Sequence, residues 1–220
     1  LVVDCVTSLC GTSVNLDELG IDAAYSGTQK CMSCPPGLSP VSFSDRAINT
    51  IHNRSTKVPS WYLDMGMISQ YWGDDRVYHH TAPISMNYAL NESLKIVCEE
   101  GLEARYNRHS LHSQALAEGL STLGIERIAQ EGFRTPMLTS VSVPNDVDEA
   151  TVRSQLLHNY NIEIGGGLGA FKGKAWRIGL MGETCRKENV ISLLTALGEI
   201  LPKKSANEAI QTAESVYNTN

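Results

Sequence analysis

The stretch Tyr25–Gly37 reads YSGTQKCMSCPPG, and it holds a single lysine, Lys30, among small and polar residues. It begins in a short apolar segment, Ala23–Ser26, which we predict to be a strand. Pro-Pro-Gly closes the stretch, and these residues favour a tight, stiff turn. Most lone lysines are solvated amines, but a small-residue loop at the end of a strand can press a lysine against a bound group.

The first six residues, Leu1–Val6, read LVVDCV and form an apolar, β-branched run. Such a run is typical of a buried strand in a parallel sheet. We therefore expect Leu1–Val6 to be buried, and part of the protein to lie upstream of it or on a separate chain. Asp4 is near the end of this strand, at the carboxyl edge where α/β proteins bind ligands. Taken alone, Asp4 fits a helix cap or a surface carboxylate better than a ligand site.

Asp4 and Lys30 together indicate pyridoxal phosphate. That cofactor needs a lysine for its Schiff base and an acidic partner that keeps its pyridine nitrogen protonated. The two residues follow successive predicted strands, which brings them to the same edge of a parallel sheet.

Two cysteines next to this lysine have a C-x-x-C spacing, Cys31 and Cys34. A redox pair of this kind needs a βαβ context, and a zinc site needs a second pair of ligands. Cys185 and the adjacent His79 and His80 supply no such pair. We therefore predict no metal site, and we interpret the cysteines as small apolar filling in a reduced, intracellular chain.

The composition argues against two classes of partner. The 220 residues carry a formal net charge of −6, which leaves no polybasic surface for nucleic acid. No apolar run is long enough to span a bilayer, so we expect no membrane partner.

The predicted elements give an α/β fold. Strands are expected at 1–6, 23–26, 40–44, 125–128, 138–143, 161–164 and 175–180. Helices are expected at 46–53, within 60–72, from about 85 to 123 with a break at Gly101, at 149–159 and at 187–201, followed by a polar tail. The segment Tyr78–Pro83 is expected to be a loop. We place residues 1–103 in the C-terminal part of a large domain and residues 104–220 in a small α+β domain.

Arg177 lies in an apolar segment, AWRIGLMG, that is otherwise suited to burial. A buried guanidinium needs an anion, either an internal carboxylate or the carboxylate of a substrate, which its fork can hold at two points. The glycine run Gly165–Gly169 precedes this segment. It lacks the G-x-G-x-x-G register of a dinucleotide loop, so we interpret it as a backbone turn beside a ligand.

Ordered motifs over nearly the whole chain resemble the class V aminotransferases, in particular the alanine–glyoxylate and serine–pyruvate group. They are VD-x-V-x-S at 3–8, YSG-x-QK at 25–30, PPG at 35–37, SDRA at 44–47, RSTKVPSWYLDM at 54–65, YHHTAP at 78–83, IEI-x-GGLG at 162–169 and WRIGLMG at 176–182. The resemblance implies an α/β fold of the fold-type I pyridoxal-phosphate transferases. This chain would supply the second half of the large mixed-sheet domain and the small α+β C-terminal domain.

The resemblance also implies roles for individual residues. Lys30 would be the Schiff-base lysine, and Asp4 would be the partner of the pyridine nitrogen. Val6 would pack on one face of the cofactor ring, Gln29 would lie beside it, and Arg177 would hold the α-carboxylate of the substrate.

Two further residues imply a homodimer. In such a family, Tyr78 and Thr81 would reach the phosphate of the cofactor in the neighbouring subunit. The family's phosphate-binding loop and the aromatic residue stacked on the ring come from the first half of the protein, which is not in this sequence. We therefore expect activity of the complete protein and only part of the cofactor site in this chain.

The implied reaction moves an amino group from alanine or serine to glyoxylate or another small 2-oxo acid. Among enzymes, the alternative is another class V member, a lyase or a desulfurase. Outside enzymes, the alternative is a non-catalytic fragment or scaffold chain. The implied compartment is a peroxisome or a mitochondrion, with the cytoplasm left open.

Overall fold

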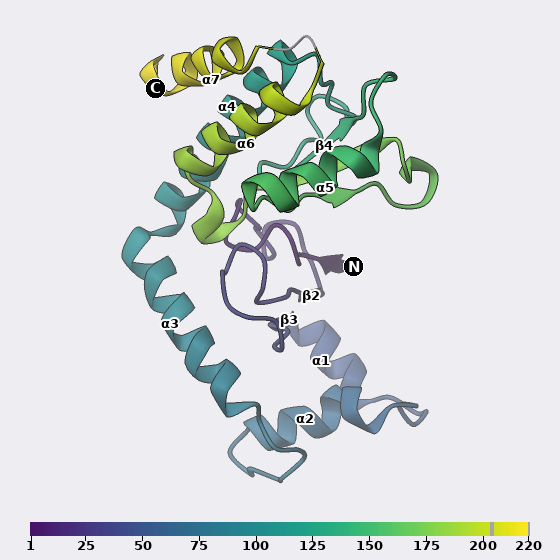
Figure 1. Ribbon diagram of the computed structural model, residues 1–220. Coiled ribbons are helices and arrows are strands. Elements are labelled where there is room, and N and C mark those ends of the chain that lie inside the picture. Colours follow the sequence, from purple (N-terminus) through teal and green to yellow (C-terminus); the bar gives the residue numbers. More distant parts are fainter. Residues whose placement is uncertain (203–204, 220) are drawn as a thin grey trace.

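The computed structural model describes residues 1–202 and 205–219 and places helices at both ends of a small central sheet (Figure 1). One end carries α1 (Asp45–His52) and α2 (Met65–Trp72). The long helix α3 (Ile84–Glu100) runs from there to the other end, which carries α4 (Leu102–Thr122), α5 (Glu149–Tyr160), α6 (Lys187–Ile200) and α7 (Ala206–Thr219). None of the helices in these ranges is both long and apolar enough to cross a membrane.

The first sheet has the order β1-β2-β3, with β1 (Val2–Asp4), β2 (Ala23–Tyr25) and β3 (Val41–Phe43). β1 and β2 are parallel, and β3 is antiparallel to β2. The three strands lie where the sequence predicts them, but they are shorter. β1 ends at Asp4 because the carboxylate of Asp4 turns back and accepts the N–H of Val6 at 2.8 Å.

The predicted burial of Leu1–Val6 is wrong for this chain. Leu1 is 67% exposed and Val2 is 69% exposed. β1 lies at the edge of the described sheet and pairs with β2, and of its two valines Val3 is half-buried while Val2 stays exposed. An apolar pattern predicts a strand, but burial also requires another element to pack against it.

The second sheet has the order β4-β6-β5, with β4 (Leu138–Ser142), β5 (Gly165–Gly166) and β6 (Ala175–Gly179), all antiparallel. Alternate residues of β4 are buried, as expected for a strand with one covered face. The core between this sheet and α4–α7 includes the fully buried Trp176, Leu116 and Leu197. Each such side chain contributes about 1.5–3 kcal/mol when it is removed from water.

Two predicted strands of this second part are wrong. At 125–128 the chain makes a single bridge, between Arg127 and Val141, before it turns away from β4. At 161–164 no strand forms, because Asn161 ends α5 in the left-handed region at φ 56°. Pairing with β6 begins only at Gly165, where the missing side chain allows close approach.

The predicted polar tail is also wrong, since α7 forms over Ala206–Thr219. Ala209, Ala213 and Val216 are spaced at i, i+4 and i+7 and are buried, and α7 packs against α4 and α6. Lys203, Lys204 and Asn220 of the expected tail lie outside the described residues.

The helix boundaries follow local sequence signals. Ser44 caps α1 by accepting the N–H of Ala47 at 3.2 Å, which agrees with the helix expected at 46–53. Asp64 caps α2 in the same way, which confirms the helix expected within 60–72. Gly101 separates α3 from α4 at φ 81°, a backbone conformation that favours glycine.

We propose to divide the chain between residues 103 and 104, after the first two residues of α4. The sheet β1-β2-β3 lies before this point, and β4-β6-β5 with the larger core lies after it. A smaller core is shared between the two parts, because Met137 packs with Cys31, Met32 and Val97. The two parts are therefore in direct apolar contact.

His109 of α4 also ties elements together inside the structure. Its Nδ1 lies 2.8 Å from the carbonyl oxygen of Arg105, and its Nε2 lies 3.0 Å from the backbone N of Gly182. A carbonyl can only accept and an N–H can only donate, so Nδ1 carries the proton and the ring is neutral. Burial lowers the pKa of His109, and the guanidinium of Arg108 lowers it further.

We predict that replacing Gly198 of α6 destabilises the fold. A Cβ at Gly198 would lie 2.5 Å from Cα and 2.7 Å from N of Ala206, and these backbone atoms cannot rotate away. Gly198→Ala should lower the free energy of unfolding by about 1–3 kcal/mol, measured by urea denaturation. Ser192→Ala, on the exposed face of the same helix, should stay within about 0.5 kcal/mol of wild type. Equal effects of the two variants would contradict the close α6–α7 approach.

We further predict that acid destabilises the fold through His109. The unfolded chain binds a proton to this ring near pH 6.5, whereas the folded chain does so only at lower pH, so stability is complete above about pH 6.5 and falls below it. His109→Gln should make the fall in unfolding free energy between about pH 7.5 and 5.5 shallower. The exposed neighbour variant Ser110→Ala should keep the wild-type fall. A His109→Gln profile identical to wild type would refute this role.

Candidate active site

The carboxylate of Asp4 is held at the carboxyl end of β1. Its Oδ1 accepts the N–H of Val6 at 2.8 Å, and its Oδ2 accepts the hydroxyl of Tyr25 at 2.9 Å. Tyr25 is the residue opposite Asp4 in the parallel register, so the two strand ends meet at one sheet edge. The hydrogen bond to Asp4 raises the pKa of Tyr25, so the hydroxyl stays a donor to the carboxylate.

Lys30 lies in a closed turn just beyond β2. The N–H of Ser33 donates to the carbonyl of Lys30 at 2.9 Å, and the N–H of Cys34 donates to the carbonyl of Thr28 at 3.0 Å. Thr28 also donates its hydroxyl to the carbonyl of Pro35 at 3.1 Å, which joins the turn to the Pro-Pro-Gly segment. The side chain of Lys30 is half-buried, and its amine makes no hydrogen bond or ion pair within the described part of the chain.

The cysteines beside Lys30 are packing residues, as the sequence interpretation favours. Cys31 is fully buried and Cys34 is buried, and all six cysteines of the chain are free. Burial raises the pKa of the Cys31 thiol to about 11, which keeps it protonated and unreactive at neutral pH. Its thiol donates to the carbonyl of Thr7 at 3.3 Å.

Arg177 lies in β6, next to the glycine strand β5. Its Nε donates to the carbonyl of Gly166 at 2.7 Å. Within the described ranges no carboxylate pairs with Arg177, so the internal ion pair that the sequence left open is not formed. One edge of the guanidinium is thus fixed by backbone while its outer nitrogens remain available to an anion.

The glycine run leaves no space for side chains around Arg177. A Cβ at Gly165 would lie 3.3 Å from Nη2 of Arg177, and one at Gly166 would lie 2.8 Å from Oε1 of Glu149. A Cβ at Gly167 would collide with the carbonyl of Phe171. These glycines bring the backbone against Arg177, which agrees with a turn beside a ligand.

Tyr78 and Thr81 are distant in sequence from these groups and are exposed. The two hydroxyls lie 2.8 Å apart. In the same loop, His79 stacks on Trp61 with ring centroids 4.0 Å apart and makes a 2.7 Å hydrogen bond with His80. No cluster of metal-ligating side chains is found in residues 1–202 and 205–219, and these histidines are occupied by structural contacts.

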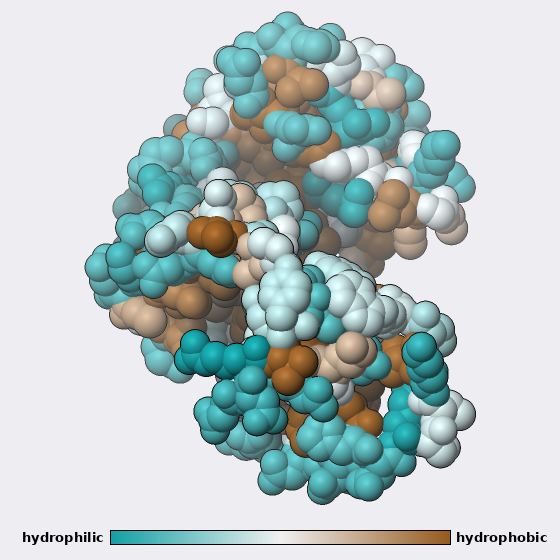
Figure 2. All heavy atoms as spheres, turned by 90° about the horizontal axis from the view of Figure 1, so that it is seen from below, coloured by the Kyte–Doolittle hydropathy of each residue, from teal (hydrophilic) through white to brown (hydrophobic). Residues whose placement is uncertain are grey.

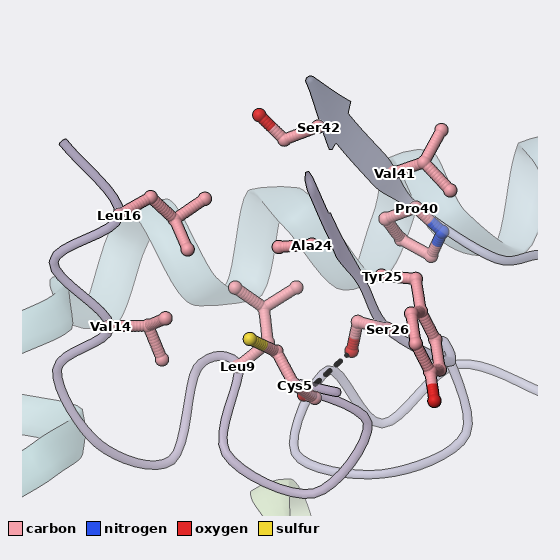
Figure 3. Close-up of a pocket in the computed structure, with 10 residues that line it drawn as sticks. All are labelled: Cys5, Leu9, Val14, Leu16, Ala24, Tyr25, Ser26, Pro40, Val41 and Ser42. Carbon is pink, nitrogen blue, oxygen red and sulfur yellow. Dashed lines mark hydrogen bonds between the residues drawn. The ribbon is translucent and has the colours of Figure 1, made fainter. Parts of the chain in front are cut away.

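An apolar cavity of about 120 Å³ lies on one side of β2 and β3 (Figure 3). Figure 3 shows the side chain of Ala24 pointing toward the loop after β1, which carries Leu9, Val14 and Leu16, with the hydroxyl of Ser26 donating to the carbonyl of Cys5 at 3.0 Å. None of the predicted site residues lines this cavity. The residues around this cavity include the strand ends next to the site, and we assign the cavity no ligand.

The structure brings Asp4, Val6, Gln29 and Lys30 to the carboxyl side of β1 and β2. Arg177 belongs to the other sheet, but its strand leads directly into the turn at 181–184, and the N–H of Glu183 in that turn donates to Ser33 Oγ at 2.8 Å. The parts that contain Lys30 and Arg177 are therefore linked.

Sequence reasoning missed Arg105 and His109, which hold this junction from α4. Both sit in an ordinary polar-looking helix, LEARYNRHSLH, and no motif distinguishes them there. Only their burial, at 0% exposure each, reveals them.

The residues present fit pyridoxal phosphate. Each Asp4 oxygen accepts one hydrogen bond, and a carboxylate can accept about four, so a pyridine N–H can be added. The Lys30 amine is uncommitted and half-buried, and Val6 offers a half-buried apolar side chain on the same edge.

The comparison with protein families gives one assignment over most of the chain. Residues 1–187 match the model of the aminotransferase class-V family. The alanine–glyoxylate aminotransferase of Felis catus is 42% identical to this chain, covering 94% of it and 51% of the relative. The chain spans about half the length of the curated relatives it matches, and the matches cover their C-terminal half.

Solved structures agree with this assignment. The alanine–glyoxylate aminotransferase of Nostoc sp. aligns with a TM-score of 0.88 at 48% identity, covering 90% of this chain and 53% of that one. The ureidoglycine–glyoxylate aminotransferase of Bacillus subtilis aligns with a TM-score of 0.94 at 39% identity, covering 99% of this chain and 57% of that one. The expected fold of the fold-type I pyridoxal-phosphate aminotransferases is thereby confirmed. This chain belongs to the class V aminotransferases and is related to their alanine–glyoxylate group.

Proposed function

We propose that the complete protein is a transaminase that moves an amino group from alanine or serine to glyoxylate or another small 2-oxo acid. The observation that carries the proposal is the placement of Asp4 at the carboxyl end of β1 and of Lys30 in the turn that follows the parallel strand β2. The names of the relatives support glyoxylate as the acceptor, because the alanine and the ureidoglycine transaminases both carry it.

The family depends on pyridoxal phosphate, and we propose that Lys30 and Asp4 hold it here. When bound, this cofactor supplies an electron sink at the substrate α-carbon, provided that its ring nitrogen is protonated. Asp4 would accept the N–H of that nitrogen. Tyr25 and the Val6 N–H fix the carboxylate in the orientation that this bond requires.

Lys30 Nζ has two tasks in this proposal. It would hold the cofactor covalently in the resting protein, and as a free amine it would accept and return the proton of the substrate α-carbon. The closed turn from Thr28 to Cys34 restricts where this amine can reach. Val6 and Gln29 would border the ring, since both lie on the same side of the sheet edge.

Arg177 would bind the α-carboxylate of both amino acid and 2-oxo acid. Its Nε is held by the carbonyl of Gly166 at 2.7 Å, and its outer nitrogens have no carboxylate partner in the described chain. A planar fork with one fixed edge binds a carboxylate at two points and orients the α-carbon.

A homodimer would complete the site through Tyr78 and Thr81. The surface around them is rich in exposed aromatic side chains: Trp61, Tyr62, Trp72, Tyr78 and Tyr88 are each more than half exposed. Figure 2 views the molecule from the end that carries α2, and brown and pale residues lie there among the teal ones. Exposed apolar surface of this extent is typical of an interface.

The structure does not favour a desulfurase. Such an enzyme needs a mobile, reactive cysteine, but five of the six cysteines are buried and the exposed Cys98 lies within α3. The proposed peroxisomal or mitochondrial location rests on the resemblance alone.

We predict that borohydride reduction of the complete, cofactor-loaded protein leaves a pyridoxyl group on Lys30, located by peptide mass spectrometry. Lys30→Ala should remove the adduct and reduce turnover by about 10²–10⁴-fold, the contribution of a positioned proton-transfer group. Lys95→Ala, which changes an exposed lysine of α3, should keep both. An adduct on another lysine, or full turnover in Lys30→Ala, would contradict the assignment of Lys30 as the cofactor lysine and favour a scaffold chain.

We predict that Arg177→Lys in the complete protein lowers kcat/KM for amino and 2-oxo acids by about 10–100-fold, mostly through KM. The physical reason is that a point charge replaces a two-point fork. Steady-state kinetics with the alanine–glyoxylate pair measure the effect. Arg54→Lys, an exposed arginine that donates to the carbonyl of Thr56, is the matched control. An Arg177→Lys protein with wild-type KM would show that the carboxylate binds elsewhere.

A further inference from the structure

The turn that carries Lys30 is held from outside at three consecutive residues. Nη2 of Arg105 donates to the carbonyl of Cys31 at 2.7 Å, and the hydroxyl of Ser93 donates to the carbonyl of Met32. The hydroxyl of Ser33 accepts the N–H of Glu183 at 2.8 Å. We call these contacts the lysine-turn clamp. They come from α4, from α3 and from the turn after β6.

Arg105 is the strongest member of the clamp. Its side chain is fully buried, and its Nη1 donates to Glu100 and, at 3.3 Å, to Glu183. A buried guanidinium is stable only when anions and carbonyls surround it, so Arg105 cannot shift without breaking several of these bonds at once. The Cys31 carbonyl is therefore fixed to a fully buried cation that two carboxylates also hold.

The clamp also leaves no free space between the turn and Gly182. Ser33 has φ 61°, in the left-handed region, and Gly182 lies directly against it. A Cβ at Gly182 would overlap Ser33 Oγ and lie 2.8 Å from the Cys31 carbonyl oxygen and 3.2 Å from Nη2 of Arg105. The turn after β6 thus presses on the Lys30 turn, with Arg105 between them.

This contact connects the two proposed functional groups. Lys30 directly precedes the clamped residues, and Arg177 lies on β6, whose chain continues into the clamping turn. Fixing the two turns to each other fixes the proposed cofactor lysine relative to the proposed substrate arginine.

We propose that Arg105 and Ser93 are positioning residues for Lys30, which act by holding the carbonyls of Cys31 and Met32 rather than by touching the cofactor or the substrate. The proposal rests on the proposed role of Lys30. Loss of the clamp leaves the amine more exposed but less often in the position from which it captures the cofactor.

The test uses the complete protein and two readouts at Lys30. The first is the rate of trace acetylation of Lys30 in the cofactor-free protein, relative to the exposed Lys95, by mass spectrometry. The second is the rate at which added pyridoxal phosphate becomes reducible onto Lys30 by borohydride. Arg105→Lys and Ser93→Ala should each raise the relative acetylation rate several-fold and lower the capture rate by about tenfold, the effect of losing about one net hydrogen bond.

The matched control is Arg108→Lys. Arg108 lies on the same helix and in the same ion network, and it donates to the carbonyls of Gly182 and Cys185, but it makes no hydrogen bond to residues 31–33. This variant should keep both Lys30 rates within about twofold of wild type, even if it lowers stability by the net worth of about one hydrogen bond. Circular dichroism checks that each variant is folded.

Opposite changes of the two rates in Arg105→Lys and Ser93→Ala, absent in Arg108→Lys, support the proposal. Unchanged rates in the folded variants, or equal changes in Arg108→Lys, overturn it. If Arg105→Lys does not fold, the folded Ser93→Ala decides by the same criterion. If the wild-type protein yields no adduct on Lys30, the proposed function fails, while the acetylation rates still report whether the clamp holds the turn.

Discussion

The hydrogen bond from Arg105 to the Cys31 carbonyl, made inside the protein, joins the two parts of the chain. The part of the chain that contains Cys31 forms the short strands that end at Asp4 and Tyr25. The part that contains Arg105 forms the helical core, whose sheet carries Arg177. Apolar packing supports the junction, since Met137 meets Cys31 and Met32 there. Apolar packing alone has no direction, however, whereas a guanidinium between fixed acceptors sets one geometry.

The charges around Arg105 explain why it can be buried. Glu100 pairs with both Arg105 and Arg108, and these hydrogen bonds lower the pKa of Glu100. Burial raises the pKa of Glu183, but Arg186 and Arg105 outweigh it, so the net shift is downward. Both carboxylates therefore stay charged at neutral pH, and the network spans the end of α3, the start of α4 and the turn after β6.

The sequence carries the local signals of this fold well. Strands one and two, the helix that follows Ser44, the helix within 60–72 and the break at Gly101 all depend on a few neighbouring residues, and they appear where predicted. The errors need long-range information. Leu1–Val6 has the composition of a buried strand, yet β1 lies at the edge of its sheet, and Leu1 and Val2 stay exposed. No strand forms at 161–164, because the residues that pair with Arg177 and Trp176 of β6 are Gly165 and Gly166. The spacing of Ala209, Ala213 and Val216 does predict α7, so that helix was readable.

The candidate site likewise contains residues that the sequence reveals and residues that only the structure reveals. Lys30, Asp4 and Arg177 are recognisable because their chemistry is unusual in apolar or small-residue segments. Arg105 is not, because an arginine on an amphipathic helix looks solvated until three carbonyl and carboxylate partners surround it.

A crystal structure of the complete protein with pyridoxal phosphate tests the central claim most directly. We predict electron density joining Lys30 Nζ to the cofactor, an Asp4 oxygen within about 3 Å of the pyridine nitrogen and the Arg177 fork facing the open side of the ring. A cofactor bound away from the edge of β1 and β2, or joined to a different lysine, would contradict it.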